Sequence, residues 1–326
     1  MKKILFRADG NREIGLGHFM RLISLVEILK DDFHCTFAIQ APEKYVQTII
    51  ADNGVELINL RKTQDYISEA QYLASLAENF DVVIFDGYFF KTEYQKILKK
   101  GNWKLVYIDD LHEFKIEADL ILNHAVGLNE SQYNVNETAT ICLGTQYAML
   151  RSSFLEASKR DRKFDNDLKV FVCLGGSDPN NYTLSIVKKL VKFENLYRIS
   201  VVVGVAYPFY DELKKVKDSR LNILKGLTPD EMAIVMNESN IGVVSSSNIS
   251  FEYASIGGMM FVIQTADNQE DIHRFIVTEK LGIHFDQISE EILGKELFEQ
   301  QLANQRKYFD GKSNYRIIKK IKKLLC

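Results

Sequence analysis

Short apolar runs alternate with helical patterns along the whole chain. In the first helical pattern the apolar residues recur every three or four positions, at Leu22, Leu25, Val26 and Leu29. The apolar runs of the first half are 3–8, 35–39, 55–57, 82–86, 104–108 and 120–123. Continuous apolar runs separated by helices are typical of a parallel sheet that helices cover on both faces. The first half therefore predicts an α/β domain.

The same pattern restarts after a polar, charged segment at 156–167. Further apolar runs follow at 169–174, 199–203, 222–224, 241–244 and 260–263. We therefore predict two doubly wound α/β domains, 1–158 and 159–326, with a hinge near residue 160. Ligands of such sheets bind at the carboxyl ends of the strands, so we expect the active site in a cleft between the domains.

The composition of the chain argues against several classes of protein. The 326 residues include 41 basic and 44 acidic ones, and a net charge of −3 argues against a nucleic-acid partner. No stretch reaches the roughly 18 apolar residues of a membrane span, and the first residues do not form a signal peptide. The four cysteines and six histidines lack the spacing of a metal or redox site. We expect a cytoplasmic protein with free thiols and without a metal or cofactor.

The last segment, 316–326, predicts a short, basic amphipathic helix. Such a helix can lie on an anionic membrane or pack its apolar side against a domain. We expect it to pack, with the N-terminal domain as a candidate surface.

The turn Ile14-Gly15-Leu16-Gly17-His18 joins the first predicted strand to the first predicted helix. Small residues at such a turn let backbone N–H groups approach an anion, which the positive end of the helix dipole attracts. His18 lies in the first helical turn, where it would point at the bound group, and Arg21 follows one turn later. We count Gly15, Gly17 and Arg21 among the candidate residues that bind the substrate or UDP. The alternative is a tight turn with His18 on the surface.

Polar turns also follow predicted strands of the second half. Their candidate ligand-binding residues are Gly176, Ser177, Ser247, Asn248, Ile249, Ser250, Glu252, Asn268 and Gln269. Hydroxyl and amide groups at a helix N-terminus offer donors to a diphosphate, and a carboxylate one turn later accepts both ribose hydroxyls. The alternative for 245–252 is a capped helix, but a cap needs one or two polar residues rather than six. The amides of Asn268 and Gln269 suit sugar hydroxyls and acetamido groups.

Carboxylates end two predicted strands of the first half. Asp86-Gly87-Tyr88 follows one strand, and Asp109-Asp110 follows the next. The paired aspartates are either a catalytic or metal-binding dyad, or turn and cap residues. The sequence leaves these two interpretations open.

In this order the motifs resemble those of the PseG nucleotide-sugar hydrolases of the pseudaminic acid pathway and of the related SpsG-type spore-coat polysaccharide proteins. The resemblance runs over most of the chain. Its motifs are Arg7-Ala8-Asp9-Gly10, Ile14-Gly15-Leu16-Gly17-His18 with Arg21, Asp86-Gly87-Tyr88, Gly175-Gly176-Ser177-Asp178-Pro179, the Ser/Asn turn ending in Glu252, and Asn268-Gln269.

The resemblance implies a GT-B fold like that of the lipid II synthase MurG, with two Rossmann-like domains and a cleft between them. It implies that UDP binds the C-terminal domain and that the sugar faces the N-terminal one. Glu252 would bind the ribose, 247–250 the diphosphate, and the loop at Gly226-Leu227 the uracil. The implied reaction is metal-independent hydrolysis of UDP-2,4-diacetamido-2,4,6-trideoxy-β-L-altrose to UDP and the free sugar.

His18 would position or deprotonate the attacking water, and Tyr88 and Asn268 would orient the water or the sugar. Histidine suits this role because its unperturbed pKa lies near neutral pH. Two alternatives remain. One is a glycosyltransferase of the same architecture, in which a sugar or lipid acceptor replaces water. The other is a nucleotide-sugar binding module without turnover.

Overall fold

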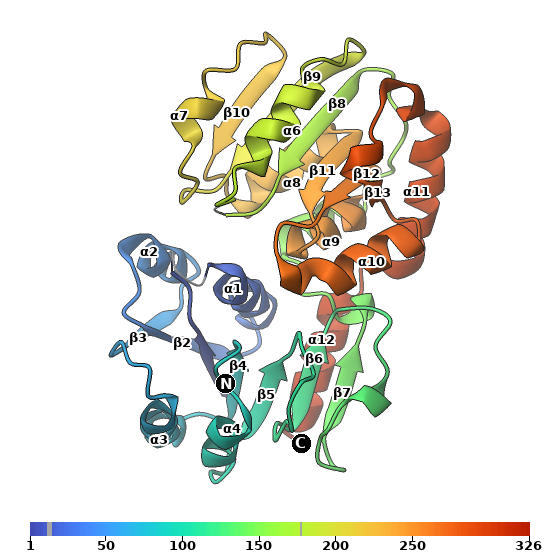
Figure 1. Ribbon diagram of the computed structural model, residues 1–326. Helices are drawn as coiled ribbons and strands as arrows, with labels where there is room; N and C mark the ends of the chain where they lie inside the picture. Colours follow the sequence, from blue (N-terminus) through green and yellow to red (C-terminus); the bar gives the residue numbers. More distant parts are fainter. Residues whose placement is uncertain (12–14, 177) are drawn as a thin grey trace. The chain divides into compact units, whose positions relative to one another are not determined.

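The computed structural model describes residues 1–11, 15–176 and 178–326, which form two compact units (Figure 1). The N-terminal unit comprises Met1–Met149 and Ser313–Cys326, and the C-terminal unit comprises Leu150–Lys312. Each unit has its own parallel sheet, so each is described by itself.

The N-terminal unit contains a seven-stranded sheet in the described residues, with the order β3-β2-β1-β4-β5-β6-β7. Its strands are β1 (Lys3–Ala8), β2 (His34–Gln40), β3 (Glu56–Leu60), β4 (Val82–Asp86), β5 (Lys104–Ile108), β6 (Leu120–Asn123) and β7 (Thr140–Leu143). Its helices are α1 (Gly17–Leu29), α2 (Lys44–Asp52), α3 (Tyr66–Ala77), α4 (Thr92–Leu98) and α12 (Ser313–Leu324). All the strand pairs are parallel, and the strand order reverses between β1 and β4.

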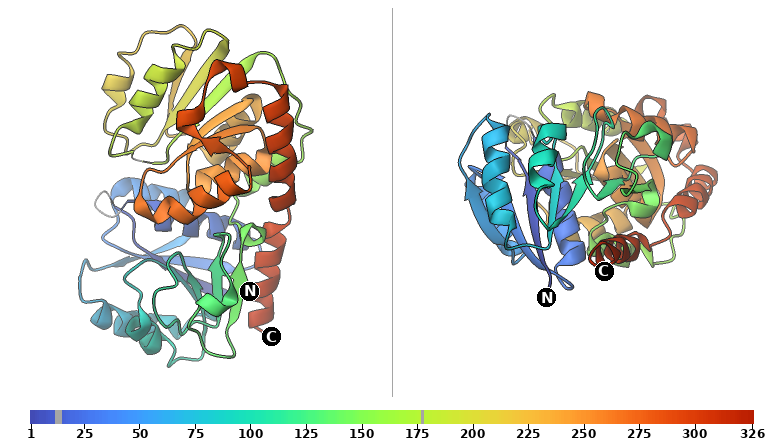
Figure 2. Two further views of the ribbon diagram at one scale, coloured as in Figure 1. Left: turned by 45° about the vertical axis from the view of Figure 1, so that its right-hand side comes forward. Right: turned by 90° about the horizontal axis from the view of Figure 1, so that it is seen from below.

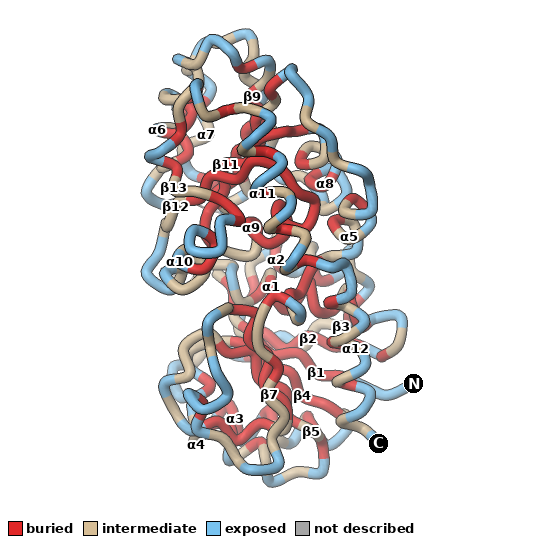
Figure 3. Tube along the Cα trace, turned by 90° about the vertical axis from the view of Figure 1, so that its right-hand side faces the viewer, coloured by how far each residue is buried: buried red, intermediate tan, exposed pale blue. Residues whose placement is uncertain are grey.

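The two faces of this sheet carry separate cores. Side chains of α1, α2 and α12 pack on one face, whereas those of α3 and α4 pack on the other. Along β1, Ile4 and Phe6 belong to the first core and Leu5 to the second, as the period of two in a strand requires. Strands covered on both faces are buried along their length, which Figure 3 shows for β1, β4 and β5.

The C-terminal unit contains a six-stranded sheet in the described residues, with the order β10-β9-β8-β11-β12-β13. Its strands are β8 (Leu168–Cys173), β9 (Leu196–Val203), β10 (Leu221–Lys225), β11 (Ile241–Ser245), β12 (Met259–Ile263) and β13 (Ile283–His284). Its helices are α5 (Ser152–Ser158), α6 (Tyr182–Leu190), α7 (Tyr210–Leu213), α8 (Pro229–Glu238), α9 (Asn248–Ile256), α10 (Glu270–Thr278) and α11 (Lys295–Tyr308). The strand order reverses between β8 and β11.

The prediction of two doubly wound α/β sheets is confirmed, with two strands missed. These are β7, which is only partly buried, and β13, which has two residues. The division between the units falls at Leu150 rather than at 158/159, because α5 packs on α8 and α9 and so belongs to the C-terminal unit. No helix of the described residues is long and apolar enough to cross a membrane.

The C-terminal helix α12 returns to the N-terminal unit. Ile317 and Ile321 are fully buried in the core that contains α1, and the two views of Figure 2 show the helix beside this unit. Its basic residues therefore occupy the outer side of a packed helix. Lys322 forms an ion pair there with Asp32.

We expect Ile321→Ala to lower the free energy of unfolding by about 2–4 kcal/mol, because it leaves a cavity in the core. The matched control on the same helix is Lys319→Ala, whose side chain is exposed. Urea denaturation of both variants measures the difference. Equal stability of the two variants would contradict the packing of α12.

Candidate functional site

The N-terminal candidate site lies where the order of the first sheet reverses. β1 and β4 are neighbours, with Ala8 aligned with Asp86 at their carboxyl ends, and α1 begins beyond β1 at Gly17. A Cβ at Gly10 would lie 2.7 Å from the Cβ of Phe19, so only glycine allows α1 to pack this closely. Ligands of doubly wound sheets bind at this kind of switch point.

The predicted anion cradle is described in part, because Ile14 lies outside the described residues. Gly15 has φ +81°, a conformation that favours glycine, and its carbonyl accepts the N–H of Asn11 at 3.2 Å. Leu16 is the N-cap of α1 and supplies no side-chain hydrogen bond. The first N–H groups of α1, at Gly17 and His18, therefore have no side-chain cap among the described residues.

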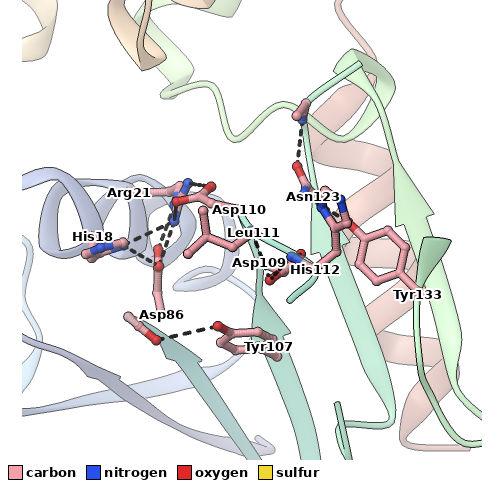
Figure 4. A network of polar contacts seen from close by, with 12 residues as sticks. His18, Arg21, Asp86, Tyr107, Asp109, Asp110, Leu111, His112, Asn123 and Tyr133 are labelled. Carbon is pink, nitrogen blue, oxygen red and sulfur yellow. Dashed lines mark hydrogen bonds and ion pairs between the residues drawn. The ribbon is translucent and has the colours of Figure 1, made fainter. Parts of the chain in front are cut away.

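His18, Arg21, Asp86 and Asp110 form a single polar network (Figure 4). His18 Nδ1 lies 2.7 Å from Asp86 Oδ1. Arg21 donates to both oxygens of Asp86, from Nε at 2.6 Å and from Nη2 at 2.7 Å. It also donates to Asp110, from Nη1 at 2.5 Å and from Nη2 at 2.9 Å. The network joins α1 to the carboxyl end of β4 and to the loop after β5.

The charges in this network fix the tautomer of His18. Burial alone would raise the pKa of Asp86, but Arg21 and His18 outweigh it and lower the pKa to about 2. Asp86 is therefore a carboxylate at neutral pH and accepts hydrogen bonds only. Nδ1 of His18 must carry the hydrogen it shares with Asp86, so Nε2 of the neutral ring is left as a proton acceptor.

Tyr88 completes the surroundings of His18. Its ring meets the His18 ring edge-on, with centroids 4.5 Å apart. The predicted residues Gly15, Gly17, His18, Arg21 and Tyr88 thus lie within one unit and around one helix start. Asp86, which the sequence analysis placed only at a strand end, is the central acceptor.

The two neighbouring aspartates after β5 have different partners. Asp109 is buried and accepts the N–H groups of Leu111 and His112, so it closes its own loop. Burial, followed by the nearby charge of Asp110, raises the pKa of Asp109. Asp110 instead pairs with Arg21. The described residues contain no cluster of acidic, cysteine or histidine side chains that could hold a metal ion.

The C-terminal unit has its own candidate site, at the switch point between β8 and β11. Gly176 is exposed in the turn after β8, and Ser177 lies outside the described residues. Asp178 accepts the N–H groups of Tyr182 and Thr183 at the start of α6, so it acts as a helix cap.

The serine-rich turn after β11 leads into α9. Ser247 is the N-cap of this helix without a side-chain cap bond, and its hydroxyl lies 2.9 Å from that of Ser245. The Ser250 hydroxyl donates to the Ser247 carbonyl at 2.7 Å. The hydroxyls thus bond within the turn, and the N–H groups of Asn248 and Ile249 form the open start of α9.

Glu252, one turn into α9, is buried and forms an ion pair with Arg151. Arg151 Nε and Nη2 lie 3.0 and 2.9 Å from the same oxygen, Oε1. The other oxygen, Oε2, accepts no hydrogen bond from the residues that the structure describes. Burial raises the pKa of Glu252, while Arg151 acts in the opposite direction. The sequence analysis missed Arg151, because 101 positions separate it from Glu252.

Three other predicted residues lie on loops of this unit. Leu227 is half-buried after β10, and Asn268 is exposed before α10. The Gln269 side chain bonds within its own loop, where Oε1 accepts the Thr265 N–H at 2.8 Å. His273 of α10, which the sequence analysis also missed, has Nδ1 2.8 Å from the Ser246 hydroxyl.

No family model matches the chain, but three curated proteins are similar to it over most of its length. The UDP-2,4-diacetamido-2,4,6-trideoxy-β-L-altropyranose hydrolase of Campylobacter jejuni is 28% identical, over 87% of this chain and 99% of that protein. SpsG of Bacillus subtilis, a spore coat polysaccharide biosynthesis protein, is 22% identical, over 80% and 77%. An uncharacterised protein of Methanocaldococcus jannaschii is 25% identical over 88% of this chain, which spans only 61% of that protein.

Solved structures share the fold of the whole chain. MurG of Acinetobacter baumannii has a TM-score of 0.65 at 10% identity, covering 99% of this chain and 100% of MurG. MnaA of S. aureus, in a co-structure with UDP, has a TM-score of 0.64 at 14% identity, covering 100% and 97%. The fold is therefore GT-B-like, and the chain is a distant homologue of the PseG-type hydrolase and of SpsG.

The Glu252–Arg151 pair predicts a stability that depends on pH. In Arg151→Met the pKa of Glu252 rises further, so the folded state holds its proton more tightly than the unfolded chain does. The free energy of unfolding then falls as pH rises through the raised pKa. We expect Arg151→Met to be about 3 kcal/mol less stable than the parent at pH 8 and closer to it at pH 5, measured by urea denaturation.

The control is the double variant Arg151→Met/Glu252→Gln, in which no carboxylate is left to titrate. Its free energy of unfolding should therefore change less between pH 5 and pH 8 than that of Arg151→Met does. A loss in Arg151→Met alone that is equal at both pH values would contradict this account.

Proposed function

We propose that the protein hydrolyses a UDP-sugar, with His18 as the general base. The observation that carries the proposal is the hydrogen bond from His18 Nδ1 to the buried carboxylate of Asp86. It leaves Nε2 as an acceptor beside the open start of α1. The homology to a UDP-sugar hydrolase over 87% of the chain supports the choice of substrate class.

In the proposed reaction, Nε2 of His18 takes a proton from a water molecule while the water oxygen attacks the anomeric carbon. The bond between that carbon and the phosphate oxygen breaks, and its electron pair leaves with UDP. Asp86 stabilises the imidazolium that forms and does not itself take the proton. Tyr88, whose ring abuts His18, and Asn268 would orient the water or the sugar.

The nucleotide is assigned to the C-terminal unit. The N–H groups of Asn248 and Ile249 would bind the diphosphate at the start of α9, together with Ser247, Ser250 and the turn at Gly176 and Ser177. Backbone donors and a helix dipole stabilise the developing charge of the leaving group, so we expect turnover without a metal. The co-structure of MnaA with UDP, which has the same fold, supports a UDP site in this architecture.

Glu252 and Leu227 would bind the nucleoside. Oε1 of Glu252 is held by Arg151, so Oε2 is the oxygen we assign to the ribose hydroxyls. The loop at Gly226-Leu227 would lie against the uracil, and Gln269 would support the loop that carries Asn268.

Arg21 is a candidate for substrate or UDP binding in the sequence analysis, and we propose a positioning role for it instead. Its guanidinium nitrogens donate to Asp86 and Asp110. We therefore assign it to holding Asp86 and His18, and we assign the anion contacts in this unit to the backbone of Gly15 and Gly17.

A glycosyltransferase is the second candidate, which the similarity to SpsG and the MurG-like fold support. His18 would then deprotonate an acceptor hydroxyl in place of water. The two functions share the donor site and differ in whether UDP is released without an acceptor.

We expect UDP release from UDP-2,4-diacetamido-2,4,6-trideoxy-β-L-altrose without any acceptor and with a chelator present. A coupled assay for UDP measures this, with UDP-N-acetylglucosamine as a comparison substrate. Tight UDP binding without release would favour the transferase, and release that stops with the chelator would contradict metal independence.

We expect His18→Ala to lower the rate of UDP release at least about 100-fold, because the base is lost, while UDP binding is retained. The matched control is His34→Ala, since His34 is an exposed histidine of the same unit. Fixed-time assays of UDP release measure turnover, and isothermal titration calorimetry with UDP measures binding. Unchanged turnover in His18→Ala would remove this residue from the mechanism.

A further inference from the structure

We propose that Asp110 is a positioning residue for His18: through Arg21, it supplies the surplus negative charge that lets His18 hold a proton. The inference rests on the proposed role of His18 as the base. It extends that role to Asp110, which lies in the loop after β5 and acts on His18 through Arg21.

One nitrogen of Arg21 lies at the centre of the network. Nη2 is 2.7 Å from Asp86 Oδ1, 2.9 Å from Asp110 Oδ2 and 3.2 Å from His18 Nδ1. The first two contacts are hydrogen bonds to carboxylates. The third joins two nitrogens that both carry hydrogen, so it places a cation beside the histidine ring (Figure 4).

The cation alone would oppose protonation of His18. Asp86 cancels the charge of Arg21, and the pair leaves no net charge to favour an imidazolium. Asp110 adds a second carboxylate, so the network has a net charge of −1 while His18 is neutral and becomes neutral when His18 takes a proton. Without Asp110, the same protonation would turn a neutral network into a positive one.

This balance matters because the network is shielded from water. The side chains of Asp86, Arg21, His18 and Asp110 are 0%, 8%, 16% and 20% exposed. Charges interact more strongly there than they do at a fully hydrated surface. A nearby carboxylate is expected to change the proton affinity of a histidine about tenfold, that is by about one pH unit.

The neighbouring titratable groups do not replace Asp110. Asp109 is engaged by the N–H groups of its own loop. Burial, and then Arg21, lowers the pKa of His124 to about 4, so this ring is neutral. Burial, followed by the nearby carboxylates, raises the pKa of Tyr107 well above its usual value, and the hydroxyl keeps its proton. Tyr88 contributes the edge of a ring.

The test is an NMR titration of the ring of His18 in Asp110→Asn. We expect the midpoint of the His18 titration to fall by about one pH unit, because the surplus charge is gone. Asp110→Glu restores the charge and should restore the midpoint. The matched control is Asp81→Asn, which removes the same charge beside the opposite end of β4, where Asp81 pairs with Lys2.

Turnover gives a second readout. In Asp110→Asn the acid limb of the pH–rate profile should shift to lower pH together with the midpoint of the His18 titration. The plateau rate should fall about threefold to tenfold, because a weaker base accepts the proton less readily. Asp81→Asn should leave both unchanged.

Equal His18 midpoints in folded Asp110→Asn and Asp81→Asn would overturn the inference and leave the proposed hydrolysis standing. Conversely, full turnover in His18→Ala would contradict the proposed role of His18 as the base. The NMR titration would still show whether the charge of Asp110 affects the protonation of His18. Should Asp110→Asn not fold, Asp110→Gln compared with Asp110→Glu makes the same test.

Discussion

The pairing of the buried guanidinium of Arg21 determines the geometry of the N-terminal site. A charge removed from water is tolerated only where opposite charges and hydrogen bonds compensate it. Arg21 meets this condition with the carboxylates of Asp86 and Asp110, which lie at the ends of two neighbouring strands. The pairing ties the N-terminal part of α1 to the carboxyl edge of the sheet. His18 lies three residues earlier on the same helix face, so its ring is held against Asp86.

In the C-terminal unit, the ion pair at the switch point has its charges reversed with respect to the helix. There the helix that begins at the switch point, α9, carries the carboxylate, Glu252, and the cation, Arg151, comes from elsewhere in the unit. Both helices begin without a side-chain cap, at Leu16 and at Ser247. Among the described residues, each unit therefore combines a helix start that lacks a side-chain cap with a charged side chain held by an ion pair, which suits the binding of an anion beside a reacting group.

Much of the fold followed from the sequence, because strands buried on both faces leave continuous apolar runs. β7 left no such run, since it is short and partly exposed. The polar, charged stretch 156–167 suggested a boundary near residue 158, whereas the packing of α5 on α8 and α9 places α5 within the C-terminal unit.

For the candidate site, the sequence indicated individual residues but not their partners. His18 and Arg21 were singled out through the glycine turn, which is a local pattern. The partners of Arg21 lie 65 and 89 positions away, and only the strand order and register bring them together. The sequence therefore indicated only that Arg21 is a candidate for substrate or UDP binding, and the structure adds its contacts with two carboxylates. The Arg151–Glu252 pair was missed for the same reason.

The most direct test of the account is the tautomer of His18, read from the ¹⁵N chemical shifts of its ring at neutral pH. The account predicts a protonated Nδ1 and an unprotonated Nε2, because the Asp86 carboxylate accepts the only ring hydrogen. A ring protonated at Nε2 and bare at Nδ1 would contradict it, since no proton acceptor would then face the substrate.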